Sequence, residues 1–424
     1  MTRLLLLVVL FFVGQFTTAH AQDTIEFLNG TTLPCTILEV RKADKEFDIE
    51  VQVGKNTIQQ TFPYSQVHAV TFEGKRFELN PKPVSSETGS STATTSRTRQ
   101  EVTKLIDTAG RTPPDWYAST SLNVPDTLDL DWPLKPPEGW NNKENVGQYI
   151  WDIVNPNEQR WRAGIKLVHQ CMEQHKSHPA LLKRDMDKLG TMYFTLLQDY
   201  PRAAFWLQQA GTKVGEPAGV HLAECYWRMG NREMALAQLK AKALPVPAVK
   251  LFGDLGEIDL ALRLAEAYAG TQVADQAFLA AGDALRNAQR PEEAIAYYRR
   301  VLESSNARNQ EYEARFKARA QESIEAIELF DKADVSQVAD GTYSSSSTGY
   351  NGPLGITVKL AGGKIVSLTV TDHQEKQFYA ALTDTPKQII DTQGVRDIDG
   401  TSGATITSQA ITNATAKALA QGAR

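Results

Sequence analysis

The feature that most constrains this chain is a run of small and hydroxyl-bearing residues near its C-terminus, residues 399–408, with the sequence DGTSGATITS. Gly403 and Ala404 leave the backbone bare enough for a bulky group to lie against it. A helical pattern follows over residues 408–420. Thr405 would then lie just ahead of a helix N-terminus, where unpaired N–H groups and the helix dipole favour an anion. The local chemistry therefore predicts a phosphate site.

The helix expected over residues 408–420 is amphipathic, with one apolar face made of Ile411, Ala414, Ala418 and Leu419. Thr407 or Ser408 suits the N-cap, because a hydroxyl oxygen accepts a bond from a first-turn N–H group. Gly422 suits the end of the helix.

The segment Asp399-Gly400-Thr401-Ser402-Gly403-Ala404-Thr405 resembles the flavinylation motif of the FMN-binding domain family. In that motif Asp, two free positions, Ser or Thr, Gly, Ala and Thr follow one another. The family occurs in the C subunit of sodium-translocating NADH:quinone reductase and in the G subunit of related redox complexes. The resemblance implies FMN joined through its phosphate to the last Thr by a flavin transferase that uses FAD. It implies these cofactor-binding residues: Asp399, Ser402, Gly403, Ala404, Thr405 and Thr407.

We expect the FMN-binding domain to span the C-terminal segment, residues 331–424. The resemblance itself begins at about Asp340. Its further parts are an opening strand at 340–343, a glycine-rich turn at 349–353, a hairpin of strands 354–360 and 365–370, and a short helix at 386–390. The family often has Thr at the position after Glu375, where this chain has Lys376. The alternative interpretation is a Ser- and Thr-rich loop that caps an ordinary helix.

The N-terminus has the charged start, apolar run and small-residue cleavage site of a secretory signal peptide over residues 1–21. The apolar run is shorter than the ~20 residues that a spanning helix needs. We therefore expect an exported, periplasmic or extracytoplasmic protein that contacts a membrane only through partners. The three cysteines are expected to be buried free thiols.

The length of 424 residues indicates several domains, and 42% hydrophobic and 22% charged residues are typical of a globular protein. A net charge of −5 gives no indication of nucleic-acid binding. Short alternating runs over residues 22–80 predict a small β-barrel of SH3-like type. Residues 81–145 are expected to be a linker, rich in Ser, Thr and charge up to about residue 112, followed by a Pro- and Trp-rich extended segment whose aromatic residues dock onto helices.

Residues 146–330 show a helical pattern in which small and large residues recur. Leu189-Gly190 with Tyr193 is followed 33 residues later by Leu222-Ala223 with Tyr226. This pair of small and large residues marks the first helix of each repeat, and it recurs at Ala281-Gly282. A second pattern, which marks the second helix of each repeat, occurs at Ala203-Ala204, 230–236, 256–262 and 291–295. The spacing is close to the ~34 residues of tetratricopeptide repeats, and the segment resembles a degenerate array of about four units. Such an array would present a groove to a protein or peptide and act as a docking module separate from the C-terminal segment.

Cys171, His175 and His178 share a helical face at a spacing compatible with a metal site. Pro179 argues against that site, because the residue before a proline is displaced from helical geometry. Helix-terminal histidines are the alternative, and no metal is predicted.

The fold class predicted from the sequence is thus multidomain α+β: a small N-terminal β-barrel, a helical repeat array and an α+β FMN-binding domain. We expect a flavoprotein with covalent FMN on Thr405 that relays electrons between redox partners. A membrane-bound protein is one candidate for such a partner. The partners are a flavin transferase, a redox protein and a ligand of the repeats. Whether the chain is an enzyme is left open, since no protease triad, P-loop or Rossmann turn is visible. The alternatives are an interaction scaffold with a vestigial flavin domain and a flavin-dependent reductase of a small acceptor.

Overall fold

The structure, a computed structural model, describes residues 23–27, 32–41, 45–53, 56–64, 67–72, 75–80, 96–131, 145–152, 158–375, 380–396, 398–401 and 404–423. The chain divides into two compact units, Met1–Thr88 and Gly89–Arg424. The segment expected to be a signal peptide lies outside the described residues. Of the helices in the described ranges, none combines the length and the apolar character that crossing a bilayer would require.

The N-terminal unit is one antiparallel sheet in the order β4-β3-β2-β1-β5-β6. Its strands are β1 (Asp23–Phe27), β2 (Thr32–Arg41), β3 (Glu46–Val53), β4 (Asn56–Pro63), β5 (Val67–Phe72) and β6 (Lys75–Glu78). Ile25, Ile49 and Val67 are fully buried in its core. In the described part of this unit, the edge strands β4 and β6 do not pair with each other. The described residues therefore form an antiparallel sheet, and its closure into an SH3-like barrel stays a prediction.

A helix occupies part of the segment that was predicted to be a linker, and this corrects the prediction. Helix α1 (Arg99–Arg111) begins at Thr98, which forms a capping box with Glu101. Val102 and Ile106 are buried in the core of the helical region. The Thr98-to-Glu101 spacing was the sequence signal for this helix, and the polar composition around it concealed that signal.

The aromatic residues of the Pro- and Trp-rich segment dock onto a helix where the structure describes them. Trp116 begins the short helix α2 (Trp116–Ser119) and packs against the helical core. The guanidinium of Arg162 lies 5.6 Å from the centre of the Trp116 ring, and the ammonium of Lys166 lies 5.3 Å from that of Tyr117. Docking of the aromatic residues is thus confirmed for Trp116; residues 132–144 lie outside the described ranges.

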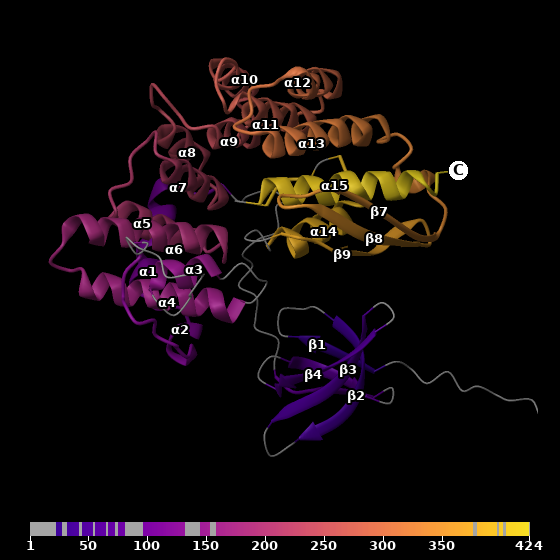
Figure 1. Ribbon diagram of the computed structural model, residues 1–424, viewed down its shortest axis with the longest axis horizontal. Coiled ribbons are helices and arrows are strands. Elements are labelled where there is room, and N and C mark those ends of the chain that lie inside the picture. The colour runs from indigo at the N-terminus through magenta and orange to yellow at the C-terminus, as the bar shows by residue number, and fades with distance from the viewer. Residues whose placement is uncertain are drawn as a thin grey trace, which may run out of the picture. The chain divides into compact units, whose positions relative to one another are not determined.

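The rest of the helical region is built from helices that pack in consecutive pairs (Figure 1). Its members are α3 (Val146–Asp152), α4 (Glu158–Gln174), α5 (Pro179–Thr195), α6 (Tyr200–Gln209), α7 (Pro217–Arg228), α8 (Arg232–Gln238), α9 (Pro247–Asp254), α10 (Ile258–Ala267), α11 (Ala274–Asn287), α12 (Pro291–Glu303) and α13 (Gln310–Glu328). The first helices of the pairs, α5, α7, α9 and α11, each contact the next one along, and α11 contacts α13. These helices therefore form one continuous layer.

Two of the small residues singled out in the sequence lie where paired helices approach each other closely. A Cβ atom added to Gly190 would lie 2.7 Å from Cγ of Leu207, on α6. A Cβ atom added to Gly282 would lie 2.5 Å from Cε1 of Tyr298, on α12. The predicted reason for small residues at these positions is confirmed.

The C-terminal segment is a three-stranded antiparallel sheet of β7 (Gly341–Thr348), β8 (Pro353–Ala361) and β9 (Lys364–Asp372), with α14 (Ala381–Thr392) and α15 (Thr405–Ala420) packed on it. The short helix η2 (Val335–Gln337) precedes it. The predicted hairpin of β8 and β9 is confirmed, and its turn places Gly362 and Gly363 at positive φ. Alternate residues of β8 are buried, as the sequence pattern indicated: Leu354, Ile356, Val358 and Leu360.

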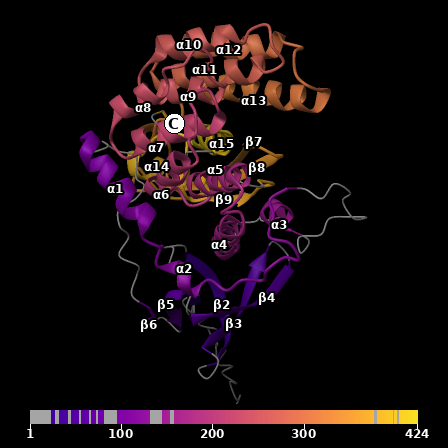
Figure 2. The same ribbon diagram turned by 90° about the vertical axis from the view of Figure 1, so that its left-hand side faces the viewer.

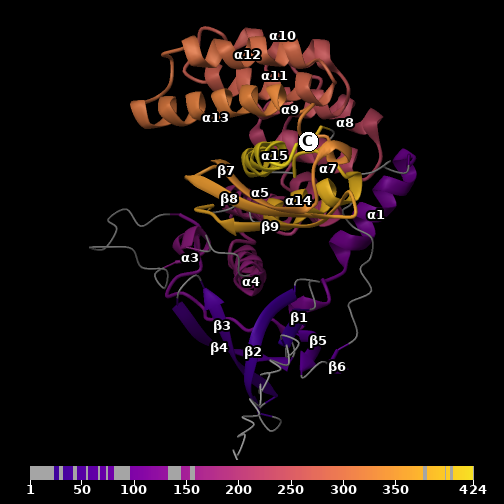
Figure 3. The same ribbon diagram turned by 90° about the vertical axis from the view of Figure 1, so that its right-hand side faces the viewer.

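Helix α15 lies between this sheet on one side and α13 on the other (Figures 1 and 3). Every residue from Thr407 to Ala416 is buried. The prediction of an amphipathic helix is therefore incomplete: the apolar face packs on the sheet side, and the polar face is covered as well. Figure 2 shows α9, α11 and α13 on the side of α15 away from the sheet. The helical region and the C-terminal segment share one hydrophobic core, which differs from the expected separate docking module.

Close packing within the helix pairs can be tested at Gly282. Gly282→Ala places a methyl group where three ring atoms of Tyr298 lie 2.5 to 2.8 Å away. We expect the free energy of unfolding to fall by about 1–3 kcal/mol, since overpacking outweighs the gain in helix propensity. Gly270→Ala is the matched control, because nothing lies within 4 Å of its added Cβ. Equal stability of the two variants in urea unfolding would contradict this packing.

Candidate functional site

Thr405 is the first residue of α15, and Ala404 is its N-cap. The helix starts three residues before the Ser408 start that the sequence predicted, and neither Thr407 nor Ser408 caps it. The Thr405 side chain is half-buried, and among the described residues its hydroxyl makes no hydrogen bond. The N–H groups of the first helical turn have no acceptor within the helix. A hydroxyl without a partner among the described residues thus stands beside backbone donors that have no acceptor within the helix.

The other predicted cofactor residues have different positions. Ser402 and Gly403 lie outside the described residues. Ala404 is buried and its N–H donates to the carbonyl of Thr401 at 2.8 Å. Thr407 is fully buried, and its hydroxyl donates to the carboxylate of Glu375. That carboxylate also accepts the N–H of Tyr350 at 2.8 Å, so it ties the first turn of α15 to the turn after β7.

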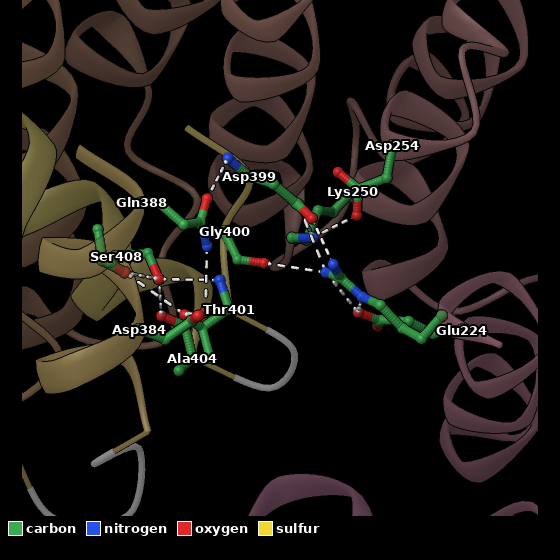
Figure 4. A network of polar contacts seen from close by, with 12 residues as sticks. Glu224, Lys250, Asp254, Asp384, Gln388, Asp399, Gly400, Thr401, Ala404 and Ser408 are labelled. Carbon is green, nitrogen blue, oxygen red and sulfur yellow. Dashed lines mark hydrogen bonds and ion pairs between the residues drawn. The ribbon is translucent and has the colours of Figure 1, made fainter. Parts of the chain in front are cut away.

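Asp399 is held by two basic side chains from the helical region (Figure 4). Arg228, the last residue of α7, forms an ion pair with the Asp399 carboxylate, and its Nη2 also donates to the carbonyl of Gly400 at 3.2 Å. Nζ of Lys250, on α9, lies 4.0 Å from Oδ1 of Asp399. The N–H of Asp399 donates to the side chain of Gln388 on α14 at 3.1 Å. Asp399 therefore joins the loop before α15 to α7 and α9.

Two more carboxylates complete this cluster. Arg228 pairs with Glu224 at 3.3 Å, and Lys250 pairs with Asp254. Burial alone would raise the pKa of Asp399, but Arg228 and Lys250 outweigh burial and hold that pKa below its usual value. Burial raises the pKa of Asp254 from 3.8 to about 6, against the attraction of Lys250. Two cations and three carboxylates thus share one partly buried site.

A second set of polar contacts joins the helical region to the middle of α15. Nη2 of Arg319, on α13, donates to Oε1 of Gln409 at 2.9 Å. Nη1 of Arg286, on α11, donates to Oδ1 of Asn413 at 2.9 Å, and the Asn413 amide donates to Ser323 at 3.2 Å. Successive layer helices α7, α9, α11 and α13 therefore each direct one basic residue to α15 or to the loop before it. Sequence reasoning missed all four, because they occupy no common position in the repeat pattern.

A small crevice opens between α9, α11 and the first two turns of α15. Its lining includes Lys250, Asp254, Arg286, Thr405 and Gln409. Its free volume of about 20 Å³ accommodates a group of the size of a water molecule and excludes a three-ring flavin. A single oxygen atom of a larger group fits this volume; the ring of a flavin would lie outside it.

Cys171 and His175 do not form the metal-like constellation considered from the sequence. Nδ1 of His175 lies 2.6 Å from the carboxylate of Asp185, and His178 precedes α5 instead of continuing α4. Burial, with Asp185 nearby, raises the pKa of Cys171 to about 12, so its thiol stays protonated at neutral pH. In the described ranges no group of three or more His, Cys, Asp or Glu side chains could hold a metal ion. All three cysteines are buried and unpaired with each other.

Comparison with known proteins identifies the C-terminal segment. Residues 349–420 match the model of the FMN-binding domain family. A protein of Treponema pallidum (strain Nichols), named "Uncharacterized protein", is 36% identical over 92 residues. That alignment covers 21% of this chain and 25% of the relative, so the chain matches about a quarter of the relative's length. No solved structure matches the chain significantly. The C-terminal segment therefore contains an FMN-binding domain over residues 349–420.

The raised pKa of Asp254 predicts a pH dependence of stability. An acid whose pKa is higher in the folded state binds a proton on folding, so its contribution to the free energy of unfolding falls as pH rises from about 4 to about 6. Relative to Asp254→Asn, the wild type should lose up to about 3 kcal/mol across this window, since one pKa unit is about 1.4 kcal/mol. Lys250, Arg228, Glu224 and Asp399 surround the group and remain in both proteins. Parallel stability curves in urea unfolding between pH 4 and 7 would refute the assignment.

Proposed function

We propose that this protein is an exported flavoprotein that carries FMN as a phosphoester on Thr405 and relays electrons between redox partners. Two observations support the proposal: the match of residues 349–420 to the FMN-binding domain family, and the position of the Thr405 hydroxyl at the start of α15, where no described residue bonds it. Bound FMN would supply the redox chemistry, because its ring accepts and passes on electrons. The chain's own residues would hold the phosphate and fix the attachment loop.

Attachment is a transfer of the FMN moiety from FAD by a flavin transferase. The bond between Oγ of Thr405 and the FMN phosphorus forms, and the P–O–P bond of FAD breaks. AMP leaves, and the hydroxyl proton of Thr405 is released to water. No electron transfer accompanies this step, so it needs no oxidant or reductant.

The partners and the remaining fold assignments belong to the same proposal. We assign the helical region to degenerate tetratricopeptide-like repeats, and the N-terminal sheet to a small barrel-like module. The layer formed by α7, α9, α11 and α13 already contacts the FMN-binding domain. A redox partner would therefore dock on the second helices of the pairs, α8, α10 and α12. An interaction scaffold with a vestigial flavin domain, or a reductase of a small acceptor, are the competing functions.

The attachment can be tested directly at Thr405. Thr405→Val keeps the branched shape of the side chain but removes the oxygen, so the fold should survive and the ester bond cannot form. The protein is expressed for export together with a flavin transferase and run on a denaturing gel. Wild type should show a fluorescent band and an FMN adduct in its intact mass, and Thr405→Val neither. A dark wild type, in cells where the transferase labels a known acceptor, would support the scaffold function instead.

The role of Asp399 can be separated from that of its partner. If the transferase recognises the Asp399 carboxylate, Asp399→Ala should reduce the labelling rate by about tenfold or more, as expected for a lost hydrogen bond to a charged group. Arg228→Met leaves that carboxylate in place and should label at least as fast as wild type. Equal losses in both variants would mean that Asp399 acts only by holding the loop on α7. The rates are measured in vitro with purified transferase and FAD.

A further inference from the structure

The crevice beside Thr405 is built from two parts of the chain that lie far apart in the sequence. Thr405 and Gln409 come from the FMN-binding domain, whereas Lys250 and Arg286 come from α9 and α11 of the helical region. A Cβ atom placed on Gly400 would lie 3.4 Å from Cε of Lys250 and 3.5 Å from Cγ2 of Thr405. Lys250 therefore reaches the immediate surroundings of the attachment residue.

Gln409 contributes a buried donor that lacks an acceptor. Its side chain is 7% exposed, and Nε2 has no hydrogen-bond partner in the part of the chain that the structure describes. The orientation of this amide is fixed, because Arg319 has only donors and must face Oε1. A buried N–H group without an acceptor costs about 1–3 kcal/mol, so an unpartnered donor on a residue that lines the crevice favours a ligand that carries an acceptor.

The charges around the crevice also favour an anion. Lys250 already pairs with Asp254, and Asp283 accepts the hydroxyl of Tyr298 at 2.7 Å, so each carboxylate of the lining has a partner. Lys250 carries three donors and Arg286 five, more than these contacts use. The first-turn N–H groups of α15 and its dipole add to the same preference.

We infer that this crevice is a binding site for a phosphoryl group, to which the helical region contributes Lys250 and Arg286 and the FMN-binding domain contributes Gln409 and the first turn of α15. The inference rests on the proposed function: in the flavin-loaded protein the occupant is the phosphoester on Thr405. One oxygen of a phosphoryl group is about the size of a water molecule, which the crevice accommodates, so the group would lie at the mouth of the crevice with one oxygen inside. The helical region is then part of the cofactor site as well as a neighbouring module.

Inorganic phosphate is the probe, added to flavin-free protein made without a transferase. The melting temperature is followed against phosphate concentration, with sodium chloride at the same ionic strength as the reference. A saturable rise is expected, because an anion that binds only the folded state stabilises it. In protein whose Thr405 carries FMN the site is filled, and the saturable rise should disappear.

Two variants test the lining without leaving a buried charge alone. Gln409→Glu keeps an acceptor for Arg319 but removes the Nε2 donor and adds a negative charge. Lys250→Met combined with Asp254→Asn removes a charge pair together. Each should raise the half-saturating phosphate concentration by about tenfold or more, as expected for the loss of a charge-assisted contact. Lys417→Met is the control, since Lys417 pairs with Glu325 at 3.2 Å near the other end of α15.

The outcomes separate this inference from the proposed function. A phosphate response that is equal in the wild type, both lining variants and the flavin-loaded protein would overturn the crevice as a binding site, even if Thr405 is labelled. A response that depends on Lys250 and Gln409, in a protein that the transferase never labels, would support the crevice and refute covalent attachment. If either variant fails to fold, the comparison of flavin-free with flavin-loaded wild type decides alone.

Discussion

The burial of helix α15 on both sides is the constraint on which the C-terminal half of the structure depends. One side of this helix packs on the sheet through Ile411 and Ala414, as in any two-layer domain. The other side carries Gln409 and Asn413, which could not be buried without partners. From the helical region, Arg319 donates to Oε1 of Gln409, and Arg286 and Ser323 bind the Asn413 amide. Since Thr405 is the first residue of α15, the same contacts fix the position of the candidate attachment residue.

The ion pair of Arg228 with Asp399 extends this joint to the loop before the helix. Asp399 and Gly400 bind the end of α7, and Lys250 of α9 lies beside them. Removing either member of such a partly buried pair leaves the other charge uncompensated, which is costly. The loop and the helical layer therefore stabilise each other. Under the proposed function, Arg228 and Lys250 of the helical region would contribute to the charge around the cofactor.

The layer of α7, α9, α11 and α13 also changes how a repeat array would be used in this protein. A free array would present this layer to another molecule, as we expected from the sequence. Here the chain's own FMN-binding domain covers this layer, and apolar residues of the layer and of the domain form one core. In the proposed function, a redox partner would bind the side of these helices that faces away from the FMN-binding domain.

The sequence by itself determined the local elements and the identity of the candidate site. Alternation in residues 354–360 predicted β8, the small residues Gly190 and Gly282 marked close helix contacts, and the motif ending at Thr405 identified the cofactor domain. Each of these features depends on residues that are close to one another in the sequence. Only the tertiary structure decided that α15 begins at Thr405, that its polar face is covered, and that Arg228, Lys250, Arg286 and Arg319 reach it. The physical reason is that each of these contacts joins residues about 90 or more positions apart, and single basic residues on four helices share no periodic pattern that would reveal their common target.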